Sequence, residues 1–371
     1  MSRLQCCLLV AAAWFGVALS AHAARALPQL HVPPGFHVAV YSDQVPNARA
    51  MALGAHGTLF VGSFRAGKVY ALTGMDATGR AEHVYVIASG LTMPVGVAFR
   101  DGALYVSALT RILKYPDIEA HLDAPPAPVV VTDKLPMQTD HGWRFIAFGP
   151  DGKLYVPIGA PCNICDRGPD YARITRMNAD GSDWQTVATG VRNTVGFDWQ
   201  PDSHALWFTN NGRDLMGDDI PADTLNRVDK IGENFGYPYC HAGNVPDPEF
   251  GKGHACSDFA QPALRLGAHV AALGMRFYVG QMFPTAYRNA IFIAEHGSWN
   301  RSRKVGYRVV AVHLGPDGKA TGSTPFLTGF LAGQKTLGRP ADVQPLRDGS
   351  LLVSDDYNGA IYRITYSEPA Q

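Results

Sequence analysis

The sequence predicts an all-β protein built as a six-bladed β-propeller, and three observations support this prediction. A pattern of apolar run, tight turn and alternating strand recurs six times along the 371 residues. Only 17% of the residues are charged, whereas the turn formers are abundant, with 39 Gly and 26 Pro. No long stretch shows the helical period. Radial arrays of four-stranded units of about 60 residues are propellers, whereas a pair of packed sheets would not explain the repeat.

The clearest copies of the repeat are residues 146–157 (IAFGPDGKLYVP) and 343–354 (VQPLRDGSLLVS). Four more diverged copies occupy residues 51–62, 95–107, 195–209 and 275–294. Asp-Gly pairs, the residues that two-residue hairpin turns prefer, stand at 101–102, 151–152, 317–318 and 348–349. We expect each copy to form two strands of one blade, and the segment from about His37 to Tyr41 to complete the last blade.

The first residues have the features of a signal peptide. Arg3 precedes an apolar stretch from Cys7 to Leu19, and Ala21-His22-Ala23 is a small-residue cleavage signal. We therefore predict a signal peptide over residues 1–23, a single propeller domain over 24–371, and export to the periplasm or the medium. No run of the sequence reaches the length of a membrane-spanning helix.

Export makes disulfides the expected state of the four cysteines that follow the signal, Cys162, Cys165, Cys240 and Cys256. The simplest pairing is local, first with second and third with fourth, although three connectivities are possible. A zinc site is the less favoured alternative, because His241 and His254 lie beside the second pair.

Charge and missing motifs exclude several classes of function. Lys and Arg total 32 and Asp and Glu total 32, so no nucleic-acid partner is expected. The sequence also lacks G-x-S-x-G, the Walker A motif and G-x-G-x-x-G, which are the signatures of serine hydrolases, NTPases and Rossmann dehydrogenases.

Two pairs of residues at strand starts can carry chemistry. Asp140-His141 precedes the third repeat, and a histidine beside a carboxylate is suited to act as a base near neutral pH. Arg192-Asn193 precedes the fourth repeat and offers donors to a carboxylate or carbonyl. Taken alone, an Asp-His pair in a loop is more often structural, and an arginine at a strand start is at least as often a cap of a blade turn.

Three other segments concentrate polar groups. Residues 210–214 (NNGRD) and 217–219 (GDD) combine Asp, Asn and backbone carbonyls, which suit a hard cation such as Ca²⁺ but also a solvated acidic loop. Residues 295–301 (EHGSWNR) follow a strand, and Arg339 opens the last repeat.

Taken together and in this order, these segments resemble the soluble, secreted quinoprotein dehydrogenases of the glucose/sorbosone dehydrogenase family, and the sorbosone-dehydrogenase-like branch most of all. The resemblance covers roughly residues 30–366. Family members are six-bladed propellers that bind pyrroloquinoline quinone (PQQ) and Ca²⁺. The resemblance implies a dehydrogenase that oxidises a sugar or a sugar-derived alcohol or aldehyde and passes the electrons to an external acceptor.

The resemblance also implies roles for particular residues. His141 matches the general base, Asp140 matches a neighbour that binds the sugar and orients the base, and Arg192 matches a residue beside the quinone and substrate oxygens. Asn193 and Arg339 match cofactor contacts. The backbone carbonyls of Gly212 and Arg213 match ligands of Ca²⁺.

Three positions depart from the family pattern. Ala341 stands where the second arginine of a carboxylate-binding pair is expected. No lysine matches the cofactor-binding lysine, for which Arg301 or Arg303 is the nearest substitute. Met93-Pro94 replaces a substrate-binding glutamine. Two alternatives stay open at this point: a Ca²⁺-dependent propeller hydrolase of the lactonase type, and a non-catalytic propeller that binds a ligand.

Overall fold

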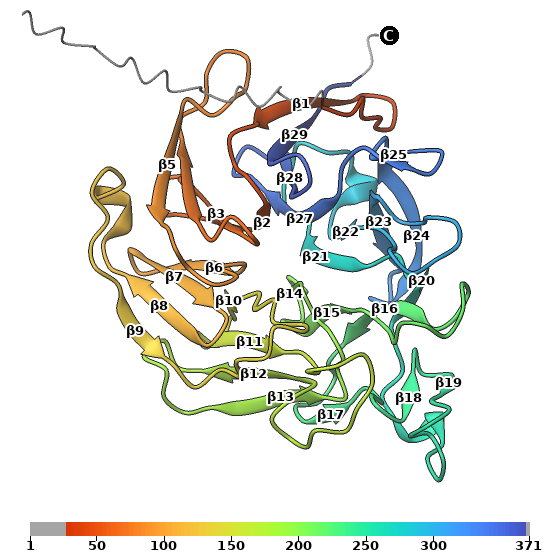
Figure 1. Cartoon of the computed structure of the whole chain (residues 1–371). Helices are drawn as coiled ribbons and strands as arrows, with labels where there is room; N and C mark the ends of the chain where they lie inside the picture. The colour runs from red at the N-terminus through yellow and green to blue at the C-terminus, as the bar shows by residue number, and fades with distance from the viewer. Residues whose placement is uncertain (1–26, 369–371) are drawn as a thin grey trace, which may run out of the picture.

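A computed structural model describes residues 27–368, so the predicted signal peptide lies outside the described residues. Six sheets follow one another around a ring (Figure 1). Within residues 27–368, no helix is long and apolar enough to cross a membrane.

The first three blades follow in chain order. The first blade contains β2 (Ala48–Leu53), β3 (Leu59–Ser63), β4 (Val69–Thr73) and β5 (His83–Ala88). The second contains β6 (Val97–Arg100), β7 (Ala103–Ala108), β8 (Arg111–Tyr115) and β9 (Val129–Thr132), with the 3₁₀ turn η1 (Ile118–Ala120) before β9. The third contains β10 (Ala147–Phe148), β11 (Leu154–Ile158), β12 (Arg173–Met177) and β13 (Gln185–Thr189), to which the short parallel strand β17 (Glu233–Asn234) is added.

The remaining blades carry the insertions. The fourth contains β14 (Phe197–Trp199), β15 (Leu206–Asn210), β16 (Ala222–Arg227) and β20 (Leu264–Ala268), and the hairpin β18 (Cys240–His241)–β19 (Val245–Pro246) and η2 (Cys256–Asp258) precede β20. The fifth contains β21 (Ala272–Phe277), β22 (Ile291–Glu295), β23 (Arg308–Leu314) and β24 (Ala320–Leu327), with η3 (Thr285–Tyr287) before β22. The sixth contains β27 (Pro340–Pro345), β28 (Leu351–Asp355) and β29 (Ala360–Tyr366), and the hairpin β25 (Leu331–Ala332)–β26 (Lys335–Thr336) precedes it.

The ring is closed by the N-terminal strand. β1 (Phe36–Ser42) pairs antiparallel with β29 and becomes the outermost strand of the sixth blade (Figure 1). The expectation for the segment from His37 to Tyr41 is therefore confirmed, as is the six-bladed architecture. Pairing of the two chain ends in one sheet joins the last blade to the first.

The six sequence repeats coincide with the two innermost strands of the six blades. Met51 pairs with Val61 in the first blade, and Val343 pairs with Val353 in the last. Between β6 and β7, Asp101 and Gly102 both have positive φ, 48° and 76°, the conformation that a two-residue hairpin turn requires. The most diverged repeat, 275–294, differs because a longer connection containing η3 joins its two strands.

Apolar side chains alternate between the two interfaces that each blade makes. In β3, Leu59 and Val61 pack against the sixth blade, whereas Phe60 packs against the second. In β15, Phe208 packs against the third blade and Trp207 against the fifth. Because both faces of the inner strands are buried, these strands read as nearly continuous apolar runs.

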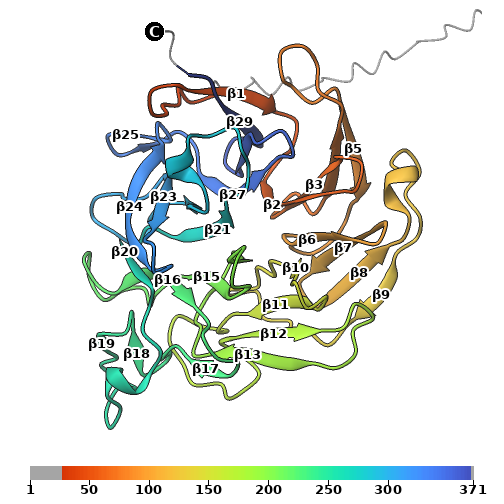
Figure 2. The same cartoon turned by 180° about the vertical axis from the view of Figure 1, so that it is seen from behind.

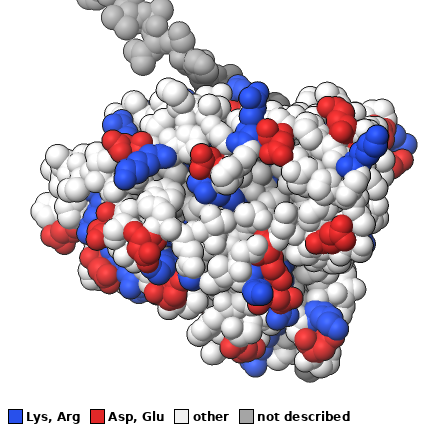
Figure 3. Space-filling model, turned by 90° about the horizontal axis from the view of Figure 1, so that it is seen from below, with Lys and Arg blue, Asp and Glu red and all other residues white. Residues whose placement is uncertain are grey.

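Both predicted local disulfides are present. Cys162–Cys165 closes a short loop after β11, and Cys240–Cys256 closes the insertion that holds β18 and β19 and projects from the rim of the ring (Figure 2). The zinc alternative is wrong, because both cysteines of the second pair are oxidised and His241 instead bonds to Asp247. Acidic and basic side chains are interspersed over the side of the molecule seen in Figure 3, in line with the neutral composition.

Candidate functional site

Blade topology brings two sets of loops to one face of the ring. In antiparallel four-stranded blades, the loops from second to third strand and the links from one blade to the next lie on the same side. A cavity of about 440 Å³ opens on this face. Most of its lining residues come from these two sets of loops and from the first residues of the innermost strands, so the repeat explains why residues distant in sequence meet here.

Six of the predicted site residues line this cavity: Asp140, His141, Arg192, Asn193, Gly212 and Arg339. Arg213 and Arg301 are not among the lining residues. The sequence segments that precede the third, fourth and sixth blades therefore meet in one cavity.

His141 is held as a neutral histidine with one ring nitrogen free to accept a proton. Its Nδ1 lies 2.7 Å from the carbonyl oxygen of Ala160, which can only accept, so Nδ1 carries the proton and Nε2 is an acceptor. No described residue hydrogen-bonds to Nε2. Burial, together with the positive charges of Arg192 and Arg144, lowers the pKa of His141 to about 3.

The backbone around His141 is fixed by close packing. His141 has a φ of 49°, which is rare for a residue with a side chain and is often found at functional sites. A Cβ on Gly159 would lie 2.5 Å from the Cβ of His141, so only glycine fits there. The buried Arg144 donates to the carbonyl oxygens of His141 and Pro136, both at 3.1 Å, and so ties down the loop that carries Asp140 and His141.

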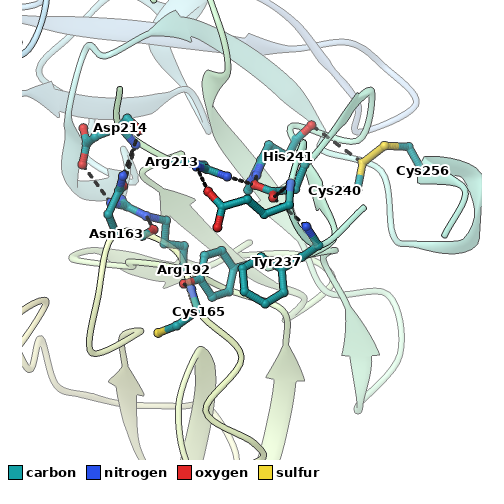
Figure 4. Close-up of polar contacts among 12 residues, drawn as sticks. Asn163, Cys165, Arg192, Arg213, Asp214, Tyr237, Cys240, His241 and Cys256 are labelled. Carbon is teal, nitrogen blue, oxygen red and sulfur yellow. Dashed lines mark hydrogen bonds and ion pairs between the residues drawn. A yellow bond between two sulfur atoms is a disulfide. The ribbon is translucent and has the colours of Figure 1, made fainter. Parts of the chain in front are cut away.

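Arg192 is 2% exposed and is oriented by the disulfide loop (Figure 4). It donates from Nε to the backbone oxygen of Asn163 and from Nη2 to the side-chain oxygen of Asn163, both at 2.8 Å. Its carboxylate partner is Asp214, at 2.8 Å. Because Asn163 lies between Cys162 and Cys165, the disulfide restrains the residue that holds Arg192.

A second cationic group lies across the cavity, where the sixth blade meets the first. Arg339 donates to the carbonyl oxygens of His296 and Gly297, and Arg49 forms an ion pair with Asp356 at 2.7 Å. Arg49 also lies over the rings of Phe64 and Trp143, a cation–π arrangement. Its Nε is buried without a partner among the described residues.

His296 belongs to this second group and differs from His141 in its partner. Its Nε2 lies 2.9 Å from a carboxylate oxygen of Asp356. Burial outweighs that carboxylate and, with the charges of Arg339 and Arg49, lowers the pKa of His296 to about 4. Burial tends to raise the pKa of Asp356, but Arg49 and His296 hold it far below its usual range. His296 is therefore neutral and donates to an ionised Asp356.

Arg49 was missed in the sequence, although the repeat register could have identified it. Arg49 lies two residues before Met51, and Ala341 lies two residues before Val343, at the matching place in the last repeat. Ala341 is buried. An arginine thus stands at the matching place of the neighbouring first blade, inside an apolar strand that reads as core.

The side chains of Arg213 and Arg301 have other partners. Arg213 forms ion pairs with Asp247 and Glu249 and so fastens the β18–β19 insertion. Arg301 donates to the backbone of Asp218 and pairs with Asp219 at 3.1 Å. His296 and Arg49 line the cavity, whereas Arg301 is not among its lining residues.

The acidic side chains near Gly212 are engaged by other protein groups. Among the described residues, no group of three or more His, Cys, Asp or Glu side chains is arranged to hold a metal ion. Asp214 bonds to Arg192 and Asn300, and Asp223 accepts the backbone N–H groups of Gly212 and Ala271. Burial raises the pKa of Asp223 to about 6. A calcium ion here would depend on backbone carbonyl oxygens.

The cavity fits a polycarboxylate better than it fits a metal. Arg49 and Arg339 supply donors for carboxylates. The side-chain oxygen of Asn193 is buried without a donor among the described residues, so it can accept an N–H from a bound molecule. These features match the donor and acceptor groups of a planar tricarboxylate such as PQQ.

Comparisons with known proteins place the chain in a family. The family model described as TrAA12-like matches residues 30–367. An uncharacterized protein of Borreliella burgdorferi is 32% identical over 362 residues, covering 91% of this chain and 91% of that protein.

Two solved structures share the fold at low identity. The holo form of the pyranose dehydrogenase PQQ domain from Coprinopsis cinerea is 19% identical, with a TM-score of 0.78, covering 92% of this chain and 98% of that one. A calcium structure of the Trichoderma reesei carbohydrate-active enzyme of family AA12 is 21% identical, with the same TM-score and the same coverage. The match of the family model over almost the whole described chain shows that this protein belongs to the TrAA12-like family.

Proposed function

We propose that this protein is a quinoprotein dehydrogenase that oxidises a sugar or a sugar-derived alcohol or aldehyde, with PQQ as cofactor and His141 as general base. The observation that carries the proposal is a neutral histidine with one unpartnered ring nitrogen, in a cavity that also holds Arg49 and Arg339. The Coprinopsis cinerea PQQ domain, which shares the fold, supports the cofactor class.

Arg49 and Arg339 would bind carboxylates of the cofactor, and Asn193 would accept its N–H group. Bound PQQ would supply an electrophilic quinone carbonyl that accepts a hydride from the substrate carbon. Trp143 and Phe64, which line the cavity beside Arg49, would exclude water on that side.

His141 would take the proton of the substrate hydroxyl at Nε2, while its Nδ1–H stays bonded to Ala160. Asp140, exposed at the cavity mouth, would accept a hydrogen bond from another sugar hydroxyl. Arg192 would stabilise negative charge that develops on the substrate oxygen. An anion bound beside Arg192 would offset the positive charge of Arg192 and so raise the pKa of His141. His141 would therefore be a stronger base in the loaded enzyme than in the empty one.

We also propose a calcium ion at Gly212 and Arg213, with their backbone carbonyl oxygens as ligands. The Trichoderma reesei calcium structure supports the choice of ion. We further propose that the protein acts in the periplasm or outside the cell, after cleavage near Ala23, and that an external acceptor removes the electrons.

The test is reconstitution. Protein prepared without cofactor is mixed with PQQ and Ca²⁺, and dye reduction is followed with aldoses, sorbosone and simple alcohols. We expect a change in quinone absorbance on binding and dye reduction with at least one sugar. His121→Ala, which replaces an exposed histidine remote from the cavity, serves as the matched control for His141→Ala. Absence of both quinone binding and dye reduction would overturn the proposal.

A further inference from the structure

A second hollow lies beside the cavity on the same face. It is a groove of about 520 Å³ between the loop after β22 and the β25–β26 hairpin. Trp299 and Arg339 line both the groove and the cavity, so the two hollows share a wall. A molecule that reaches into the cavity past Trp299 would therefore have its remaining part in the groove.

All charged side chains that line the groove are cationic: Lys304, Lys335 and Arg339. The ammonium of Lys304 donates to the hydroxyl of Thr336 at 2.9 Å, and Lys335 forms no ion pair among the described residues. Neither lysine has a carboxylate partner, unlike the nearby Arg301, which pairs with Asp219. Two lysines left without counter-ions in a shared hollow favour an anionic ligand.

The groove also offers aromatic surface. Trp299 is 69% exposed, and among the described residues it is the only tryptophan in the set of large exposed apolar side chains. The ring of Tyr307 lies under Lys304, at 5.9 Å, and under Arg339, at 5.5 Å. An exposed aromatic side chain beside a polar hollow is suited to contact the apolar face of a sugar ring.

We propose that this groove binds an anionic sugar unit joined to the sugar that is oxidised in the cavity. The substrate class is then acidic oligosaccharides, with Trp299 contacting the second ring and Lys304 and Lys335 binding its carboxylate or sulfate. This inference rests on the proposed function, because it places the oxidised unit in the cavity. The continuity with the cavity and the aromatic wall favour a saccharide over a protein partner.

The test measures binding separately from turnover. Dissociation constants are measured by calorimetry for the full chain with three disaccharides: a neutral one, one with a terminal uronate and one with a terminal sulfate. We expect the anionic ligands to bind about tenfold more tightly than the neutral one at low ionic strength, and the preference to shrink in high salt. The uronate and sulfate arms identify which anion the groove prefers.

The double variant Lys304→Gln/Lys335→Gln should lose this preference and bind the neutral disaccharide as the wild type does. Lys319→Gln, at an exposed turn of the fifth blade outside the groove, is the matched control and should keep the preference. Equal affinities for neutral and anionic ligands in the wild type, or an unchanged preference in the double variant, would overturn the inference. If the enzyme reduced dye with neutral sugars but bound neutral and anionic disaccharides equally well, the proposed function would stand and the anionic-sugar site in the groove would be rejected.

Discussion

Two sides of one cavity each carry a histidine and at least one arginine, yet the contacts of these residues differ. At the start of the third and fourth blades, His141 bonds to a backbone carbonyl and keeps Nε2 free, and Arg192 is held in place by Asn163 and Asp214. Across the cavity, His296 is fixed by the carboxylate of Asp356, and Arg49 keeps a buried Nε without a partner. The first side can accept a proton, and the second side can bind an anion.

The largest expected effect is the loss of turnover when the proton-accepting histidine is replaced. His141→Ala removes the free Nε2, so turnover should fall by about a thousandfold, within the range that a general base contributes. Quinone affinity should change little, because the anion-binding side is intact. Steady-state dye reduction and quinone absorbance titration measure the two quantities, and full activity in the variant would contradict the assignment of the base.

A substitution on the anion-binding side should instead lower quinone affinity. Arg49→Met removes a charged donor, so quinone affinity should fall by about ten- to a hundredfold, which corresponds to the 1.5–3 kcal/mol of a charge-assisted hydrogen bond. The variant also leaves Asp356 with one cation fewer, so a thermal melt must accompany the titration. Arg65→Met, at an exposed arginine that also lies over the ring of Phe64, is the control and should bind quinone normally.

A smaller effect is expected at the loop that orients Arg192. Replacing Cys162 and Cys165 together by serine frees Asn163, and kcat/KM should fall by about tenfold because Arg192 loses its fixed position. Replacing Cys240 and Cys256 by serine is the matched control, since that disulfide closes the rim insertion. It should lower stability while leaving kcat/KM of the folded protein unchanged. Equal losses of kcat/KM in the two variants would contradict a specific role for the first disulfide.

The smallest effect concerns pH. Both histidines have a pKa below the usual 6.5, about 3 for His141 and about 4 for His296. The unfolded chain therefore binds protons first as pH falls, so the stability from these neutral histidines is complete above pH 6.5 and is lost toward pH 4. NMR of the empty protein at pH 5 should show both rings neutral. A ring that titrates near pH 6.5 would contradict the lowered pKa of that histidine.

The repeat register explains what could be predicted from sequence. Met51, Ile146 and Val343 stand at matching places of their repeats, and the links that precede them carry recognisable pairs such as Asp140-His141. Those pairs could be predicted because their motifs are local. Arg49 has no such local motif, because it lies within an apolar strand, and only its register with Ala341 of the last repeat points to the cavity.

The cluster at residues 295–301 shows a second limit. Four of its residues line the cavity, but Arg301 turns toward Asp218 and Asp219 while His296 turns toward Asp356. Sequence spacing alone cannot decide which side chain of a loop finds a carboxylate on a neighbouring loop, since those partners are distant in sequence.

The most direct test of the central claim compares the two histidines. Quinone affinity and the rate of a single turnover at saturating quinone are measured for His141→Ala and His296→Ala. The account predicts that the first variant binds quinone as the wild type does but reduces it at least a hundredfold more slowly. It predicts that the second variant binds quinone more weakly yet, once saturated, reduces it within about tenfold of the wild-type rate. If affinity and rate fell together to the same extent in both variants, the division of the cavity into a proton-accepting side and an anion-binding side would be wrong.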